Sequence, residues 1–326
     1  MVYLYLTCSK SLYMMENFWN LDMKSQNIKE NLNQWIGGEH YIQTSLYNAI
    51  KNNKNFEIIN IETINQNELF KKLVKSDKII VPGWINLNDF YLQFKDKILT
   101  HVVFEYTNLQ IPDKQILCQW KHKGMNGFLP ITAIDLPENI NVTVPDYMEQ
   151  GLMIGKCISH VVYKNKADKL LHLFDILPYK VLTQYRTVDY HKIEYLKNYK
   201  DEVIKYNNIA INHCNVNNIG ILNPIEFRLV LRKLKYVLFY HGAAVATSII
   251  DALYEKCIIL GTIDVIPSDL HTNKNIYLID EWKDHEIIQL IKDIHENRIE
   301  FDENAFPSDY TIENKLTILN SLNSLN

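Results

Sequence analysis

Short runs of apolar and β-prone residues recur along the chain, and more polar, helix-prone segments separate them. Residues 2–7 alternate apolar and β-prone side chains, which is typical of a strand. Residues 78–81 form a short apolar run that stops at Pro82 and Gly83, as expected of a buried parallel strand. Further strands are predicted at residues 56–61, 99–104, 128–134, 152–154, 179–183, 208–211, 236–240 and 257–260. Helices are predicted at residues 41–51, 67–75, 166–174, 224–233, 247–255, 286–295 and 312–322.

The alternation of strands and helices is interrupted by a segment rich in turn-forming residues. Residues 136–150 contain the cluster Pro137, Asn139, Asn141, Pro145 and Asp146, which predicts a linker. Alternating βα units on both sides of a linker predict an α/β protein with two Rossmann-like, doubly wound parallel sheets. A length of 326 residues also favours two domains. We expect a first domain at 1–145, a second at 146–306, and a C-terminal helix at 307–326 that can pack back on the first domain. Two such domains facing each other place the carboxyl ends of both sheets on a shared cleft, where ligands bind.

The composition narrows the class of protein. Hydrophobic residues make up 47% and charged residues 22%, which is typical of a soluble globular chain. The net charge of −4 gives no basic field that would attract nucleic acid. The five cysteines are scattered without a CxxC pair and are expected to be reduced thiols. No signal peptide or long apolar run is recognised, so we expect a cytoplasmic protein without a transmembrane segment.

Several common catalytic and nucleotide-binding motifs are absent from the sequence. It contains no GxxxxGK[ST], no GxGxxG after a strand, no complete HExxH and no GxSxG. It also contains no Asp-x-Asp, which argues against a paired-carboxylate site for a nucleotide-bound divalent metal. Phosphate binding then falls to backbone amides, helix N-termini, hydroxyls and lysines, with no metal and no cofactor.

Residues 236–253 carry the strongest chemical signal. They predict a strand, a loop of small residues, and a helix with Thr247 and Ser248 near its start. A small-residue loop lets the backbone approach a ligand, and a helix start suits a diphosphate. Asp251, one turn into the helix, could accept hydrogen bonds from ribose hydroxyls. The alternative is an ordinary strand–turn–helix with a capping hydroxyl.

This segment and its surroundings resemble the N-acetylglucosaminyltransferase V family, which forms β1,6-linked GlcNAc branches on N-glycans. The matching donor-side motifs are Gly220-Ile221-Leu222, Val230-Leu231-Arg232, Ile249-Ile250-Asp251-Ala252, Gly155-Lys156 and Tyr163-Lys164-Asn165-Lys166. Gly37-Gly38, Thr44-Ser45-Leu46-Tyr47 and Asn126-Gly127-Phe128-Leu129 match on the other side, and all motifs keep the family's order. The chain departs from the family at the Pro-rich loop, which is Ala243-Ala244-Val245-Ala246 here, and at Asp251, where the family has Glu.

The resemblance implies a GT-B fold with an acceptor-side first domain and a nucleotide-sugar-binding second domain. It implies a metal-independent, inverting transfer of a sugar, GlcNAc as the first expectation, from a UDP-sugar to a hydroxyl of a glycan, glycolipid or glycoprotein. The candidates for the general base are Glu105, Asp89 and Glu39. The candidates for donor binding are Gly155, Lys156, Tyr163, Lys164, Thr187, Val188, Gly220, Ile221, His241, Gly242, Ala243, Thr247, Ser248 and Asp251. The acceptor-side candidates are Gly37, Gly38, Trp84 and Tyr106.

Two other readings stay open from the sequence. One is a nucleotide-sugar enzyme similar to hydrolysing UDP-GlcNAc epimerases, which acts without an acceptor. The other is a GT-B chain that has lost catalysis and serves as a binding subunit, which the altered loop and Asp251 permit.

Overall fold

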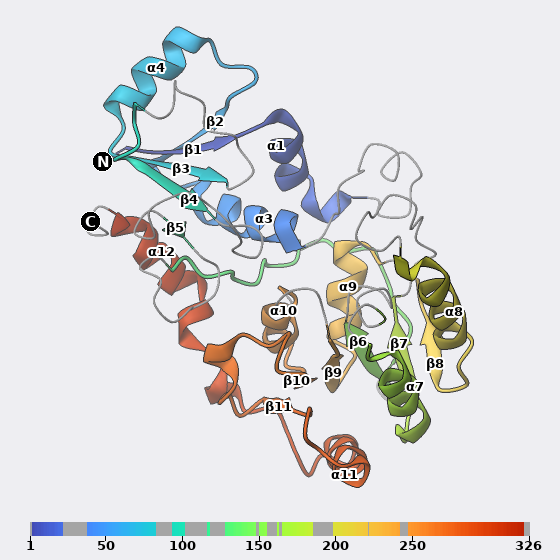
Figure 1. The fold of residues 1–326 in the computed structure, drawn as a ribbon. Helices are drawn as coiled ribbons and strands as arrows, with labels where there is room; N and C mark the ends of the chain where they lie inside the picture. Colours follow the sequence, from blue (N-terminus) through green and yellow to red (C-terminus); the bar gives the residue numbers. More distant parts are fainter. Residues whose placement is uncertain are drawn as a thin grey trace. The chain divides into compact units, whose positions relative to one another are not determined.

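The computed structural model describes residues 2–21, 38–82, 93–101, 116–117, 128–147, 150–154, 162, 165–184, 198–220, 222–241 and 247–322 (Figure 1). The chain divides into two compact units. Unit 1 comprises Met1–Leu21, Gln34–Asp135 and Pro307–Asn326, and unit 2 comprises Asp22–Asn33 and Leu136–Phe306. In the described part of the predicted linker, residues 136–147 form no helix or strand.

Unit 1 is built on a parallel sheet with the strand order β2-β1-β3-β4-β5. Its strands are β1 (Tyr3–Thr7), β2 (Phe56–Asn60), β3 (Lys78–Pro82), β4 (Ile98–His101) and β5 (Ile116–Leu117). Tyr5 of β1 lies opposite Ile58 of β2 and Ile80 of β3. This order is that of flavodoxin-like sheets, in which the chain reverses direction across the sheet between β1 and β3.

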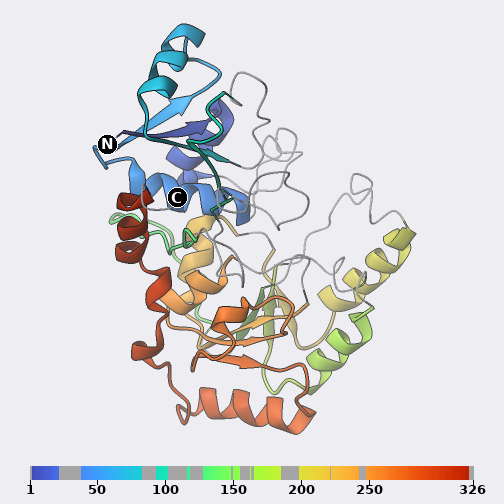
Figure 2. The same cartoon turned by 60° about the vertical axis from the view of Figure 1, so that its left-hand side comes forward.

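Both faces of this sheet are covered by helices, namely α1 (Ser9–Glu16), α3 (Gly38–Ile50), α4 (Gln66–Lys75) and α12 (Ile312–Asn320). On one face Tyr3 and Tyr5 pack with Leu46 of α3 and Leu319 of α12. On the other face Leu4 and Leu6 pack with Leu69 and Leu73 of α4. Alternate side chains of β1 therefore belong to two cores, one on each face of the sheet, as expected of a doubly wound sheet. Figures 1 and 2 show α12 beside α3.

Unit 2 contains a second parallel sheet with the order β11-β10-β9-β6-β7-β8. Its strands are β6 (Gly151–Ile154), β7 (Val181–Thr183), β8 (Val216–Asn218), β9 (Tyr236–Phe239), β10 (Ile258–Gly261) and β11 (Ile276–Leu278). Numbered along the chain this is the order 3-2-1-4-5-6 of dinucleotide-binding Rossmann sheets, read from β8 to β11. The strand order reverses between β6 and β9, where the two halves of the sheet meet.

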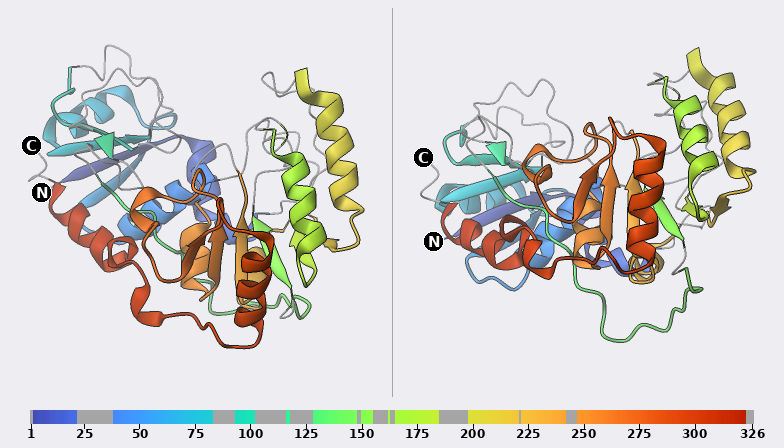
Figure 3. Two further views of the ribbon diagram at one scale, coloured as in Figure 1. Left: turned by 60° about the horizontal axis from the view of Figure 1, so that its bottom comes forward. Right: turned by 90° about the horizontal axis from the view of Figure 1, so that it is seen from below.

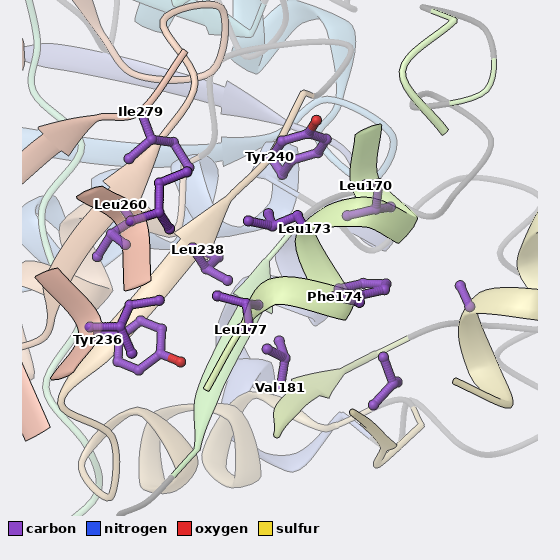
Figure 4. Close-up of a cluster of buried hydrophobic side chains, with 14 of the residues drawn as sticks. Leu170, Leu173, Phe174, Leu177, Val181, Tyr236, Leu238, Tyr240, Leu260 and Ile279 are labelled. Atoms are coloured by element: carbon purple, nitrogen blue, oxygen red, sulfur yellow. The ribbon is translucent and has the colours of Figure 1, made fainter. Parts of the chain in front are cut away.

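The helices of unit 2 are α7 (Ala167–Ile176), α8 (Lys200–Ile211), α9 (Pro224–Leu231), α10 (Ile249–Tyr254) and α11 (Asp284–His295). Figure 3 shows α7 and α8 side by side, where Tyr206 Oη donates a 2.9 Å hydrogen bond to Asp168. The core over β6, β7, β9 and β10 is filled by side chains such as Leu173, Phe174, Tyr236 and Leu238 (Figure 4). Short 3₁₀ turns lie at Phe18–Asn20, Ser268–Leu270, Glu303–Ala305 and Ser308–Tyr310.

Two predicted strands are wrong. Residues 208–211 belong to helix α8, because Val203, Asn207 and Ala210 repeat at helical spacing and are all buried. The strand of that region is β8, which begins at Val216.

The predicted strand at residues 128–134 is instead an irregular segment after Phe128. Side chains of α3 make the hydrogen bonds to this backbone that a neighbouring strand would otherwise make. Ser45 Oγ accepts the Thr132 N–H and donates to the Thr132 carbonyl, both at 3.1 Å, while Tyr41 Oη accepts the Ile134 N–H at 3.2 Å. The buried residues Leu129, Ile131 and Ile134 explain the strand-like pattern. The sequence analysis also missed α1, β5 and β11.

Candidate functional site

The carboxyl edge of the unit 2 sheet brings together polar residues that follow different strands. His241 comes two residues after β9, Thr262 and Asp264 come after β10, and Asp280 comes after β11. Parallel strands end at one edge, so these residues share it, next to the place where the strand order reverses. Ligands of open α/β sheets bind at such an edge, which makes it the candidate site of unit 2.

His241 is held there by a closed set of hydrogen bonds. Its backbone N–H donates to Thr262 Oγ1 at 2.9 Å, and the Thr262 hydroxyl donates to Asp264 Oδ1 at 2.6 Å. The same Oδ1 lies 3.1 Å from His241 Nδ1. Because a carboxylate only accepts, Nδ1 carries the proton and Nε2 lies on the opposite side of the ring. The backbone φ of His241 is +33°, a value rare for residues other than glycine.

Tyr240 and Asp280 also lie at this edge of the sheet. The Tyr240 ring packs edge-on against His241, with 4.6 Å between ring centroids. Burial, followed by the nearby carboxylates of Asp280 and Asp264, raises the pKa of Tyr240 to about 12, so it stays a neutral phenol. Asp280 Oδ2 accepts the backbone N–H of Ile263 at 2.8 Å and so ties the turn after β10 to the end of β11.

The comparisons with known proteins bear on the fold. No protein-family model matches the chain, and no curated protein matches it either. Among solved structures, it is similar to AviGT4, a glycosyltransferase involved in avilamycin A biosynthesis, with a TM-score of 0.57 and 11% identity over 99% of this chain and 97% of that one. The chain has a GT-B fold. The two parallel Rossmann-like sheets and this similarity confirm the predicted fold class.

Weaker similarities are also found to UDP-GlcNAc 2-epimerases. The enzyme from Methanocaldococcus jannaschii has a TM-score of 0.47 and 12% identity over 98% of this chain and 99% of that one. The Neisseria meningitidis enzyme bound to UDP-GlcNAc has a TM-score of 0.47 and 12% identity over 100% of this chain and 99% of that one.

In the GT-B chain, Asp251 lies in α10 as the sequence predicts, but its carboxylate is buried. Arg228 of α9 lies 2.7 Å from Asp251 Oδ1, and only 1% of Arg228 and 2% of Asp251 are exposed. Arg228 Nε also donates to Glu255 at 2.9 Å, and Arg232 Nε donates to the other oxygen of Glu255 at 2.6 Å. The ion pairs therefore join α9 to α10. A contact between Asp251 and ribose stays a prediction.

Three further donor-side candidates are described by the structure. Thr247 and Ser248 are half-buried and directly precede α10, which is 6 residues long. Gly220 follows β8 with a φ of +69°, and no atom lies within 4 Å of the position that a Cβ would take. Its N–H points to Asn218 Oδ1 at 3.4 Å. The presentation of Gly220 to a ligand stays a prediction.

Of the unit 1 candidates, Gly38 begins α3 and Glu39 lies in its first turn. The remaining candidates of both units lie outside the described residues: Asp89, Glu105, Gly37, Trp84, Tyr106, Gly155, Lys156, Tyr163, Lys164, Thr187, Val188, Ile221, Gly242 and Ala243.

The sequence analysis missed Thr262, Asp264, Asp280 and Arg228. Thr262 and Asp264 follow the predicted strand at residues 257–260, which was the available signal, whereas Asp280 follows β11, which was not predicted. Within the described ranges, no group of three or more His, Cys, Asp or Glu side chains is arranged to hold a metal ion. Across the same residues, no helix has both the length and the apolar character needed to cross a bilayer.

Proposed function

We propose that this protein is a glycosyltransferase that transfers a sugar, GlcNAc first among the candidates, from a UDP-sugar to a hydroxyl of a glycan. The observation that carries the proposal is His241, fixed by Asp264 at the carboxyl edge of a sheet with the strand order of nucleotide-binding domains. The GT-B fold and the family resemblance of the motifs support the same reaction class.

In this proposal the donor diphosphate lies against the carboxyl edge of unit 2. His241 Nε2 accepts a hydrogen bond from a sugar hydroxyl of the donor, and the hydroxyls of Thr247 and Ser248 with the Lys156 and Lys164 ammonium groups donate to the diphosphate. Such groups stabilise the charge that develops on the departing diphosphate without a metal ion. Gly220 and Ile221, with Thr187 and Val188, present backbone to the uracil.

The acceptor chemistry needs one carboxylate from the first domain. Glu105, Asp89 or Glu39 takes the proton from the acceptor hydroxyl as its oxygen attacks the anomeric carbon. The bond from that carbon to the diphosphate oxygen breaks, UDP leaves, and the configuration is inverted. Gly37, Gly38, Trp84 and Tyr106 contact the acceptor.

Thermal unfolding with a panel of nucleotides tests the proposal. UDP and UDP-sugars are expected to raise the Tm, because a ligand that binds only the native state stabilises it. NAD or ATP raising the Tm while every UDP compound fails would contradict the proposal. Product analysis then separates transfer from epimerisation, since an epimerase converts UDP-GlcNAc without an acceptor.

Substitution separates catalysis from simple binding. Glu105→Ala, Asp89→Ala and Glu39→Ala are compared for transfer and for UDP affinity, and one of them is expected to abolish transfer while keeping UDP binding. His241→Ala is expected to weaken binding of UDP-GlcNAc. His172→Ala is the matched control, because His172 is 59% exposed and pairs with Asp284 on the surface of unit 2. Full activity in all three carboxylate variants contradicts the assignment of the base.

A further inference from the structure

We propose that Thr262 and Asp264 are positioning residues that set the tautomer and the direction of the His241 ring in the donor site. The inference rests on the proposed function for the identity of the ligand, a nucleoside diphosphate sugar with a hydroxyl that can donate to Nε2. Neither residue belongs to the sequence motifs, and both act through His241 rather than by touching the ligand.

One carboxylate oxygen of Asp264 controls the His241 ring. Asp264 Oδ1 accepts from His241 Nδ1 at 3.1 Å and from the Thr262 hydroxyl at 2.6 Å. The second bond keeps Oδ1 in place, since Thr262 is only 1% exposed and stands at the end of a central strand. With Nδ1 occupied by this oxygen, the ring can offer only Nε2 to a ligand.

The Thr262 hydroxyl also holds the backbone of His241. A φ of +33° is strained for a residue with a Cβ and persists only when neighbouring groups impose it. The His241 N–H donates to Thr262 Oγ1 at 2.9 Å, so the hydroxyl that orients Asp264 also fixes this backbone. One threonine hydroxyl therefore holds both the main chain and, through Asp264, the side chain of the same histidine.

This arrangement exceeds what folding alone needs. A residue with negative φ and no ring contact would end strand β9 at lower cost, because left-handed backbone is unfavourable for non-glycine residues. The His241 side chain is 13% exposed and Asp264 is 27% exposed, so the pair reaches the surface at the carboxyl edge. Tyr240 stays a neutral phenol against the ring and adds no competing charge.

The test uses the full-length protein labelled with ¹⁵N in its histidines. Imidazole ¹⁵N shifts report the tautomer of His241, whose signals are identified by their loss in His241→Ala, and calorimetry gives the Kd for UDP-GlcNAc. Thr262→Val removes the hydroxyl with little change in shape, Thr262→Ser keeps it, and Asp264→Ala removes the acceptor. Ile263→Ala is the control in the same turn, since the Ile263 side chain is 56% exposed.

The wild-type neutral ring is expected to carry its proton on Nδ1. Asp264→Ala and Thr262→Val are expected to shift it toward the Nε2–H form, which cannot accept from a sugar hydroxyl, and so to weaken UDP-GlcNAc binding by about tenfold. Thr262→Ser is expected to restore both, and Ile263→Ala to change neither, with Tm values showing that each variant is folded. An unchanged tautomer in Asp264→Ala, or an unchanged Kd despite a changed tautomer, overturns the positioning role. Failure of the wild type to bind UDP or any UDP-sugar overturns the proposed function instead. In that case the ¹⁵N shifts still report whether Asp264 sets the tautomer of the His241 ring.

Discussion

Arg228 and Asp251 form an ion pair in the interior of unit 2, with Arg228 Nη1 2.7 Å from Asp251 Oδ1. The pair joins two consecutive helices, α9 and α10, and Glu255 supplies a second carboxylate to the same guanidinium. Two carboxylates and one fully buried arginine form a network in which each charge depends on the others for its hydrogen bonds. Removal of one member therefore leaves a buried charge without full compensation.

We expect Asp251→Ala to lower the free energy of unfolding by about 3 kcal/mol, near the lower end for a broken buried pair because Glu255 still binds Arg228. Urea denaturation of the purified variant measures this. Glu303→Ala is the control, since Glu303 pairs with Lys256 at the surface and exposed pairs contribute less than about 1 kcal/mol. If Asp251 served only to bind ribose, the stability would stay at the wild-type value and only the Kd for UDP would rise.

Lys315 of α12 gives unit 1 a pH-dependent stability. Its Nζ is buried and donates a 2.7 Å hydrogen bond to Ser45 Oγ, and burial lowers the pKa of Lys315 from 10.5 to about 7. Burial and the nearby Lys315 also lower the pKa of His101, to about 3. Between about pH 7 and pH 10 the unfolded chain therefore holds a proton that folded Lys315 has released. In this pH range the contribution of Lys315 makes the free energy of unfolding rise with pH, by up to about 1.4 kcal/mol per pH unit.

The measurement is the difference between wild type and Lys315→Met across that pH range, by urea denaturation. The difference isolates Lys315, because burial raises the pKa of Cys257 and of Tyr240 and these groups act in the opposite direction at high pH. Lys315→Met is expected to lose the rise, whereas Lys274→Met, at a side chain 78% exposed, is expected to keep it. Equal slopes in wild type and Lys315→Met would show that the ammonium is not buried in the native state.

Most of the fold follows from local patterns, and the failures have physical causes. The short apolar runs of β1, β3 and β9 are buried on both faces, so their composition alone marks them as parallel strands. Ala210 and Ile211 are also apolar, but the burial of Ala210 repeats with Val203 and Asn207 at helical spacing, which a four-residue window misses. Residues 129–134 are buried like a strand, but their backbone hydrogen bonds go to the side chains of Tyr41 and Ser45. No local sequence pattern reveals such a partner.

The candidate site was predictable only in part. His241 stands out because it follows a strand and precedes a small-residue loop. Asp264 could not be assigned to it, because the pairing depends on β10 lying next to β9 in the sheet. Arg228 looks like an exposed charge on a helix, and only the packing of α9 on α10 shows that it is buried.

Tyr236 and Tyr41 form a matched pair of buried tyrosines with opposite expected responses to loss of the hydroxyl. Within the described residues, Tyr236 Oη is buried without a hydrogen-bond partner, so Tyr236→Phe removes an unsatisfied polar group. We expect that variant to be unchanged or to gain up to about 1 kcal/mol in the free energy of unfolding. Tyr41 Oη bonds Thr132 and Ile134, so Tyr41→Phe is expected to lose about 1–3 kcal/mol. Similar losses in both variants, measured by urea denaturation, would contradict the assignment.

Gly151, at the start of β6, is expected to tolerate no larger residue. A Cβ at this position would lie 2.3 Å from the Tyr236 ring, which is fully buried and packed on His295. Gly151→Ala is therefore expected to lower the free energy of unfolding by about 1–3 kcal/mol through overpacking. Combined with Tyr236→Leu, the same substitution is expected to cost less, because the smaller side chain frees the space that the methyl group needs. A double-mutant cycle by urea denaturation measures this coupling, and purely additive losses would show that the cost of Gly151→Ala arises from the backbone rather than from Tyr236.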